Sequence, residues 1–168
     1  FRNAVTVDMA IGGSTNTTLH LPAIANEAGI KLPLSLFDEI SGKTPYLTKL
    51  SPSGTHHLED LNEAGGIPAV MKELTRKGLL DVDCVTVTGK TVGGNIASAA
   101  IRRPDVIRTL ENPYAAEGGI AVLKGNLAPD NAVVKQSAVS PEMMRHTGPA
   151  RVFDSEEAAI NAIIGRQI

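Results

Sequence analysis

The sequence is poor in cysteine and in aromatic residues. It holds one cysteine, Cys84, no tryptophan, and 3% aromatic residues in all. One thiol excludes a disulfide within the chain, and it cannot by itself hold an iron–sulfur cluster, which usually takes three or four cysteines. With so few aromatic rings the core must be aliphatic, and no stacking surface for nucleic-acid bases is expected. This cysteine usage fits a cytoplasmic location.

The sequence also lacks an excess of either charge and any long hydrophobic run. Sixteen Lys and Arg against 18 Asp and Glu leave a formal net charge of -2. The basic residues are scattered, which argues against nucleic acid or an anionic membrane surface as a partner. No segment reaches the length of a membrane span, and no signal-peptide pattern opens the chain. The four histidines lack the spacing of a common zinc site.

What is present is ample hydrophobic content, 42% of 168 residues, enough for one domain or two small ones. Hydrophobic spacing and glycine positions predict a mainly helical first half. One helix is expected from Ser14 or Thr15 to Ala28, ended by Gly29, and the most regular one spans 67–77. Shorter helices are expected at 35–40 with Ser35 as N-cap and at 58–64. Residues 3–11 could form a strand or a buried helix, and their alanine and methionine favour the helix.

The second half has the pattern of strands and loops. Apolar and β-branched runs predict strands at 120–125, 132–135 and 150–153. A brief helix is expected at 92–100, and Asp154 or Ser155 should cap a helix over 156–164, whose acidic first turn suits the helix dipole. We place a boundary within 79–103. The predicted class is α/β with α+β character.

Gly12-Gly13-Ser14-Thr15-Asn16, after an apolar run, is the most informative stretch. The glycines permit a sharp turn, and the short polar side chains that follow can contact an anionic group at the start of a helix. Gly13, Ser14, Thr15 and Asn16 are therefore the candidate substrate-binding residues. The alternative is a tight turn with simple N-capping, and the sequence leaves both open.

Two other reactive residue types have a plainer interpretation. His20 could face the site as a hydrogen-bond donor, but we expect it to be a structural histidine with its hydrogen bonds satisfied. We expect His56 and His57 to be solvated or interfacial beside a turn. Cys84 is expected to be a small buried hydrophobic residue among β-branched neighbours.

Several segments, in order along nearly the whole chain, resemble the dihydroxy-acid dehydratase family, which includes sugar-acid dehydratases. The branched-chain biosynthetic enzyme fits better than the sugar-acid branch. The short link over 79–101 resembles members without a long insertion there. The segments that carry the resemblance are residues 10–17, 59–66, 86–91, 118–129, 139–143 and 146–158.

The resemblance implies a hydro-lyase that removes water from a 2,3-dihydroxy acid to form a 2-oxo acid, in branched-chain amino-acid biosynthesis. It implies an iron–sulfur cluster and Mg2+ in the intact enzyme, and a cytoplasmic homodimer. It further implies that residues 1–80 are the C-terminal part of the family's N-terminal α/β domain. Residues 81–168 would then be a linker and the first part of a β-rich, swivelling C-terminal barrel domain.

One departure limits what is carried over from the family. Cys84 matches none of the cluster ligands, and the other metal ligands and the catalytic serine lie in parts of the family sequence that precede or follow this match. We therefore assign no catalytic residue and no metal ligand. We expect an internal fragment that binds no cofactor, is inactive by itself, and self-associates through uncovered faces and strand edges. The alternatives are a sugar-acid dehydratase of the same family and a non-catalytic module that binds a small anion or serves assembly.

Overall fold

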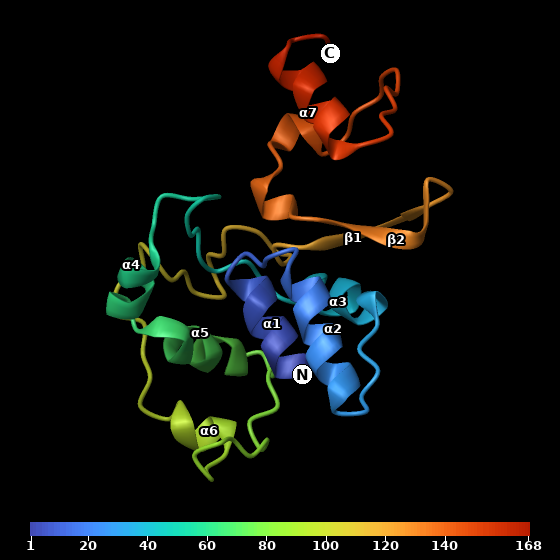
Figure 1. The fold of residues 1–168 in the computed structure, drawn as a ribbon. Coiled ribbons are helices and arrows are strands. Elements are labelled where there is room, and N and C mark those ends of the chain that lie inside the picture. Colours follow the sequence, from blue (N-terminus) through green and yellow to red (C-terminus); the bar gives the residue numbers. More distant parts are fainter.

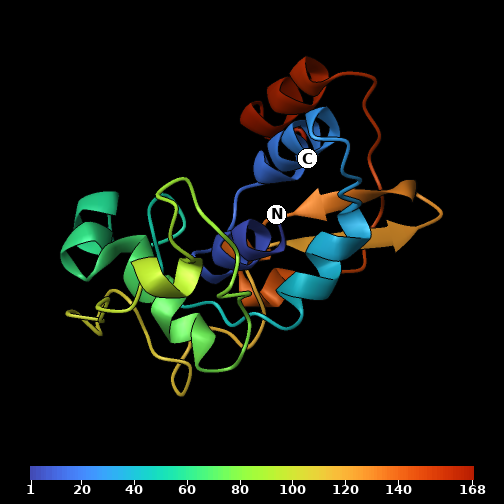
Figure 2. The ribbon, with the colours of Figure 1, turned by 90° about the horizontal axis from the view of Figure 1, so that it is seen from below.

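A short central helix organises the first half of the computed structural model, which describes all residues from Phe1 to Ile168. This helix, α1 (Arg2–Ala10), packs against α3 (Leu34–Ser41) and α5 (Gly66–Thr75), with α2 (Thr17–Glu27) beside it (Figure 1). Helices α4 (Leu58–Glu63) and α6 (Val92–Asn95) lie on the α5 side (Figures 1 and 2). The predicted helices at 3–11, 14–28, 58–64 and 67–77 are confirmed to within a few residues.

Local signals explain where these helices end. Gly29, at φ +70°, follows the C-cap of α2, and Gly78, at φ +64°, follows α5, as expected for residues in the left-handed region. Two predictions were wrong in detail. Pro33, not Ser35, is the N-cap of α3. The helix over 92–100 stops at Asn95, because Gly93 and Gly94 fill half of it and glycine propagates helix poorly.

The core has two parts, and both combine the two halves of the sequence. The first lies between α1, α4 and α5, and the second between α1, α2 and α3. The buried residues of the first part are Ala10, Leu47, Leu61, Ala64, Ala69, Val70, Leu74, Leu80, Val106, Ile107 and Leu110. Those of the second are Val5, Met9, Ala25, Leu32, Phe37, Ile40, Ile120 and Val122. As the low aromatic content predicts, the core is almost wholly aliphatic.

A single hairpin forms the sheet. Strand β1 (Ala121–Gly125) pairs antiparallel with β2 (Ala128–Val134), with Ala121 opposite Val134 and a bulge after Leu123. The predicted strands at 120–125 and 132–135 are thus confirmed, and β1 packs on α3. The strand predicted at 150–153 is wrong: these residues pair with no strand, and β-branched content cannot form a ladder without a partner. The fold is mixed, with helices and a two-stranded antiparallel sheet.

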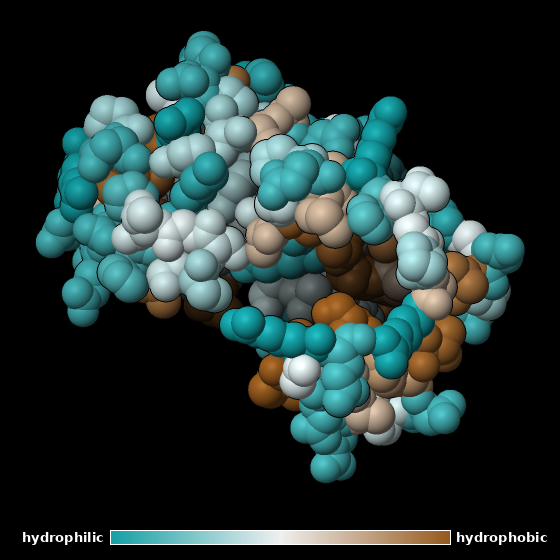
Figure 3. Space-filling model, turned by 90° about the horizontal axis from the view of Figure 1, so that it is seen from above, coloured by the Kyte–Doolittle hydropathy of each residue, from teal (hydrophilic) through white to brown (hydrophobic).

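The C-terminal helix, α7 (Glu156–Ile164), stands apart from the helical body (Figure 1). Its start was predicted correctly, since the Ser155 hydroxyl accepts a hydrogen bond of 3.2 Å from the Ala158 amide. Viewed from above, hydrophobic surface gathers around a hollow in this part of the molecule (Figure 3). No helix in the structure combines the length and hydrophobicity that crossing a membrane requires.

Candidate functional site

The Gly12–Gly13 turn between α1 and α2 is held so tightly that only glycine fits. Gly12 has φ +103° and Gly13 has φ +65°. A Cβ on Gly12 would lie 2.9 Å from Cε2 of Tyr46, and one on Gly13 would lie 2.5 Å from Cγ1 of the buried Ile120. Both the backbone angles and the close neighbours therefore require glycine here.

Residues from the second half of the chain clamp the same turn. The Gly119 amide donates to the Met9 carbonyl at 3.1 Å, and a Cβ on Gly119 would lie 1.9 Å from the Gly12 oxygen. The Ser137 hydroxyl donates to that oxygen at 3.0 Å. Sequence analysis did not identify Ser137 or Gly119 as partners of this turn, because nothing in the local pattern indicates a contact so far along the chain.

The polar residues after the turn split into two groups. Ser14 is partly buried, and its hydroxyl accepts from the Asn16 amide at 3.3 Å, while its carbonyl accepts from the Thr17 hydroxyl at 2.6 Å. Thr15 and Asn16 are exposed. Asn16 is the N-cap of α2, yet its side chain makes no capping hydrogen bond. Thus the Ser14 side chain stabilises the turn, whereas the carboxamide side chain of Asn16 makes no capping hydrogen bond.

A cavity of about 220 Å³ opens along this turn. Gly13 and Ser14 line it and Thr15 and Asn16 do not, so the structure brings only two of the four candidates to the cavity. Sequence reasoning missed the polar residues that face them across it. These are Asp8 from α1, Tyr46, Ser51, and Lys135, which directly follows β2.

Asp8 is the acidic group of this cavity. Burial raises the pKa of its carboxyl group, and this effect outweighs the Thr17 hydrogen bond, the Ser14 amide and the Lys135 charge, all of which lower it. The single proton of the Thr17 hydroxyl is shared between Oδ2 of Asp8, at 2.7 Å, and the Ser14 carbonyl, at 2.6 Å. A lone acid within the apolar run before the glycines was the one available signal for it.

Tyr46 forms the cavity wall behind the turn. Its ring is buried and lies 5.7 Å from the Tyr114 ring, and the Arg108 guanidinium covers Tyr114 at 3.9 Å. Burial, together with Tyr114, raises the pKa of the Tyr46 hydroxyl. Tyr46 is therefore a neutral hydrogen-bonding group at ordinary pH.

The two plainer interpretations of single residues were wrong. His20 is exposed on α2, so it is not a satisfied core histidine. Cys84 is exposed as well, because its neighbours Val85 and Val87 lie on a surface loop rather than in a buried strand. Hydrogen bonding to Asp81 raises the pKa of the Cys84 thiol, which makes it a poor nucleophile. His57 is solvated, as expected.

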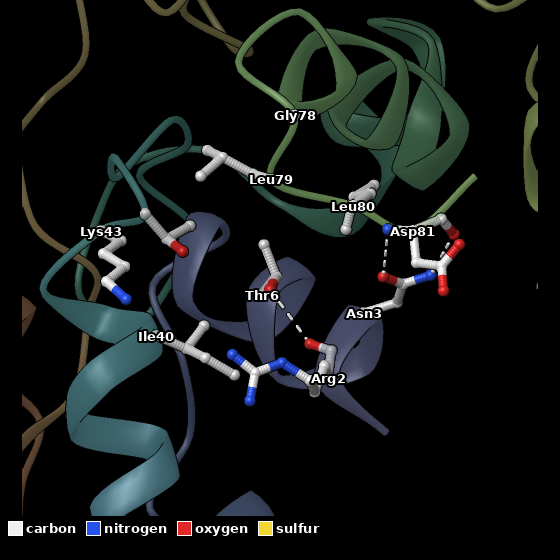
Figure 4. Close-up of a pocket in the computed structure, with 10 residues that line it drawn as sticks. Arg2, Asn3, Thr6, Ile40, Lys43, Gly78, Leu79, Leu80 and Asp81 are labelled. Atoms are coloured by element: carbon white, nitrogen blue, oxygen red, sulfur yellow. Dashed lines mark hydrogen bonds between the residues drawn. The ribbon is translucent and has the colours of Figure 1, made fainter. Parts of the chain in front are cut away.

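A second cavity, of about 340 Å³, lies between α1, the end of α3 and the loop after α5 (Figure 4). Arg2 and Lys43 bring two cations to it. Both pair with one carboxylate, Glu39, at 3.3 and 2.9 Å. The Asn3 side chain is also occupied, donating to the Asp81 carbonyl at 2.8 Å and accepting from its amide at 2.9 Å. Arg2, Lys43 and Asn3 thus already have polar partners.

The donor residues of the chain do not fit a metal centre or a cluster. No three side chains of His, Cys, Asp or Glu come together in a way that could hold a metal ion. Cys84, the single thiol, sits alone on a surface loop. No chemical step is therefore derived through a metal at these residues.

Comparison with known proteins extends over the entire chain. The family model for the N-terminal region of dihydroxy-acid/6-phosphogluconate dehydratases matches residues 1–95, and the C-terminal model matches residues 105–168. Proteins named dihydroxy-acid dehydratase from Moorella thermoacetica and Acetivibrio thermocellus are 64% and 63% identical over 168 residues, 100% of this chain. The one from Solidesulfovibrio magneticus is 65% identical over 99% of it. The chain spans about 30% of the length of each of these relatives. It belongs to the dihydroxy-acid/6-phosphogluconate dehydratase family.

Proposed function

We propose that the chain is part of a hydro-lyase that converts a 2,3-dihydroxy acid to a 2-oxo acid in branched-chain amino-acid biosynthesis. The observation that carries this proposal is the 64% identity, over all 168 residues, to a protein named dihydroxy-acid dehydratase. Sequence identity at this level, without a gap in coverage, is hard to reconcile with a different reaction class.

Within that enzyme, residues 1–80 would end the N-terminal α/β domain and residues 81–168 would begin the β-rich C-terminal domain. The iron–sulfur cluster and Mg2+ of the intact enzyme would be held by residues outside this chain, since its own donors form no such group. The chain alone would then be inactive. We also propose a cytoplasmic homodimer. The single cysteine supports the cytoplasmic location, and the exposed apolar surface supports the dimer.

The contribution of this chain to the substrate site would be Gly13 and Ser14, which line the cavity, with Thr15 and Asn16 contacting the substrate from outside it. The glycine turn is rigid, which suits a surface that must hold a substrate in one orientation. The exposed Asn16 side chain makes no capping hydrogen bond, so it is available for such a contact.

The test compares the intact gene product with the 168-residue chain in a dehydration assay that measures the 2-oxo acid. The intact protein should turn over 2,3-dihydroxy acids and the chain alone should not. Asn16→Ala in the intact protein should lower turnover at least about tenfold, the effect of one lost hydrogen bond to a charged group. Asn26→Ala, on the same helix and also exposed, is the matched control. Turnover by the 168-residue chain alone would refute the proposal that residues outside this chain carry out the chemistry.

A second candidate substrate follows from the matched family itself, whose description includes 6-phosphogluconate dehydratases. A sugar-acid dehydratase would share the fold and the reaction class. The same assay distinguishes the two when it is run with a branched five-carbon dihydroxy acid and with a six-carbon sugar acid. If neither reacts, the dehydratase proposal fails, and a non-catalytic module that binds a small anion is the remaining candidate.

A further inference from the structure

We infer that the cavity beside the Gly12–Gly13 turn binds a small hydroxy acid, with Lys135 contacting the carboxylate and Asp8 accepting a hydrogen bond from a hydroxyl group. The choice of ligand rests on the proposed function, whereas the site rests on the geometry of the cavity. Neither residue was a candidate on sequence grounds, and the two come from segments matched by different family models.

Lys135 is the cationic residue of this cavity. It is partly buried at the edge of the cavity, and it takes part in none of the ion pairs that the other charged residues form. On the neighbouring strand Lys124, by contrast, reaches Asp38 at 2.8 Å. Asp8, which lines the same cavity, is the acid that the Lys135 charge reaches, but the two form no salt bridge. An ammonium group that is partly withdrawn from water and forms no salt bridge favours an incoming anion.

Asp8 makes the cavity unsuited to a simple anion. A carboxylate offers about four acceptor positions, and the Thr17 hydroxyl, on Oδ2, and the Ser14 amide occupy two of them. The remaining capacity suits a hydroxyl donor and repels a second negative charge. A ligand that matches both residues therefore carries a carboxylate at one end and a hydroxyl group near it.

The size and polarity of the cavity agree with that ligand. Hydroxyl groups of Ser14, Ser51 and Tyr46 also line it. Its volume of about 220 Å³ is below the roughly 300–1,000 Å³ typical of pockets for drug-sized ligands. A molecule of a few carbon atoms fits this description better than a nucleotide does.

The cavity is also preorganised. Its glycine wall is fixed by Ile120 and by the backbone of Gly119, so the wall needs no ordering when a ligand arrives. In the larger cavity of Figure 4, by contrast, Arg2 and Lys43 already pair with Glu39. The cavity beside the turn is therefore the stronger candidate of the two.

The experiment measures binding by calorimetry with the intact gene product, using 2,3-dihydroxybutanoate and its deoxy analogue butanoate. Lys135→Gln should weaken binding of the dihydroxy acid about 10- to 100-fold, and Lys135→Arg should restore part of it. Asp8→Asn should reduce the ratio of the affinity for dihydroxybutanoate to that for butanoate at least about fivefold. Lys77→Gln, which removes an exposed cation far along the chain from the cavity, should leave both affinities unchanged.

The outcomes separate this site from the proposed reaction. If the enzyme dehydrates its substrate and Lys135→Gln leaves the affinity and KM unchanged while the variant is folded by circular dichroism, the site assignment fails and the function stands. If no dehydration occurs but the Lys135 and Asp8 effects on binding are seen, the function fails and the site stands. Equal affinity for butanoate and dihydroxybutanoate in the parent protein overturns the role of Asp8.

Discussion

Replacing Gly13 with alanine tests how tightly the α1–α2 turn is packed. The variant carries two costs. A left-handed backbone at φ +65° is unfavourable for a residue with a Cβ, and that Cβ would lie 2.5 Å from Cγ1 of Ile120. Gly78→Ala supplies the matched control, because Gly78 has φ +64° and a methyl group added there would meet no atom within 4 Å.

The magnitudes follow from these two terms. The left-handed conformation costs roughly 1–2 kcal/mol in either variant, partly offset by about 0.4–1 kcal/mol because alanine restricts the unfolded chain. Forcing a methyl group into a packed site adds about 1–3 kcal/mol for Gly13 alone. Gly13→Ala should therefore destabilise the protein by about 1–3 kcal/mol more than Gly78→Ala does.

Urea unfolding followed by far-ultraviolet circular dichroism measures both free energies of unfolding. Adding Ile120→Ala to Gly13→Ala removes the clashing atoms, so the double variant should be more stable than the sum of the two single effects, by about 0.5–3 kcal/mol. Two single glycine variants of equal stability, with no coupling to Ile120, would refute the claim that the turn is tightly packed.

Three further results are expected. Burial raises the pKa of the Asp8 carboxyl group above its ordinary 3.8. The contribution of this group to the free energy of unfolding is therefore fully present below pH 3.8 and is lost as the pH rises through its pKa in the folded protein. In urea titrations, Asp8→Asn should gain stability relative to the parent between pH 3 and pH 7. Glu111 has the opposite sign: hydrogen bonds from Arg76 lower its pKa from 4.5 to about 2, so Glu111→Gln should be less stable than the parent at pH 7, with the difference shrinking as the pH falls from 4.5 toward 2. A pH-independent difference in either case contradicts the argument. Finally, Leu127 is 97% exposed at the tip of a hairpin whose edges are unpaired; the 168-residue chain should self-associate in light scattering and Leu127→Lys should reduce its mass, whereas a monomeric parent would count against this.

Sequence reasoning succeeded where the determining interactions are local. The start of α7 depends on Ser155 and the acidic residues of the next turn, all within a few positions. The end of α2 depends on Gly29, whose φ of +70° is a property of one residue. Such features are encoded in short windows, so their positions could be predicted closely.

Sequence reasoning failed where contacts between distant segments determine the local structure. The environment of Cys84 depends on whether a partner strand covers its segment, and none does, so the apolar pattern around it was misleading. The run at 150–153 has strand composition but no ladder to join. Likewise Lys135 and Ser137 approach the glycine turn across the fold; the Ser137–Gly12 contact spans 125 residues, and no single-sequence pattern indicates such a contact.

Each of the two core clusters contains residues from both halves of the chain. This has a consequence for folding during synthesis on the ribosome. Val5 and Met9 emerge well before Ile120 and Val122, which belong to the cluster that buries them. Until that later segment leaves the exit tunnel, a nascent chain keeps part of the apolar face of α1 in water. Closing such long loops costs entropy before any contact repays it, so folding of this region should be slow and should offer chaperones a long interval in which to bind.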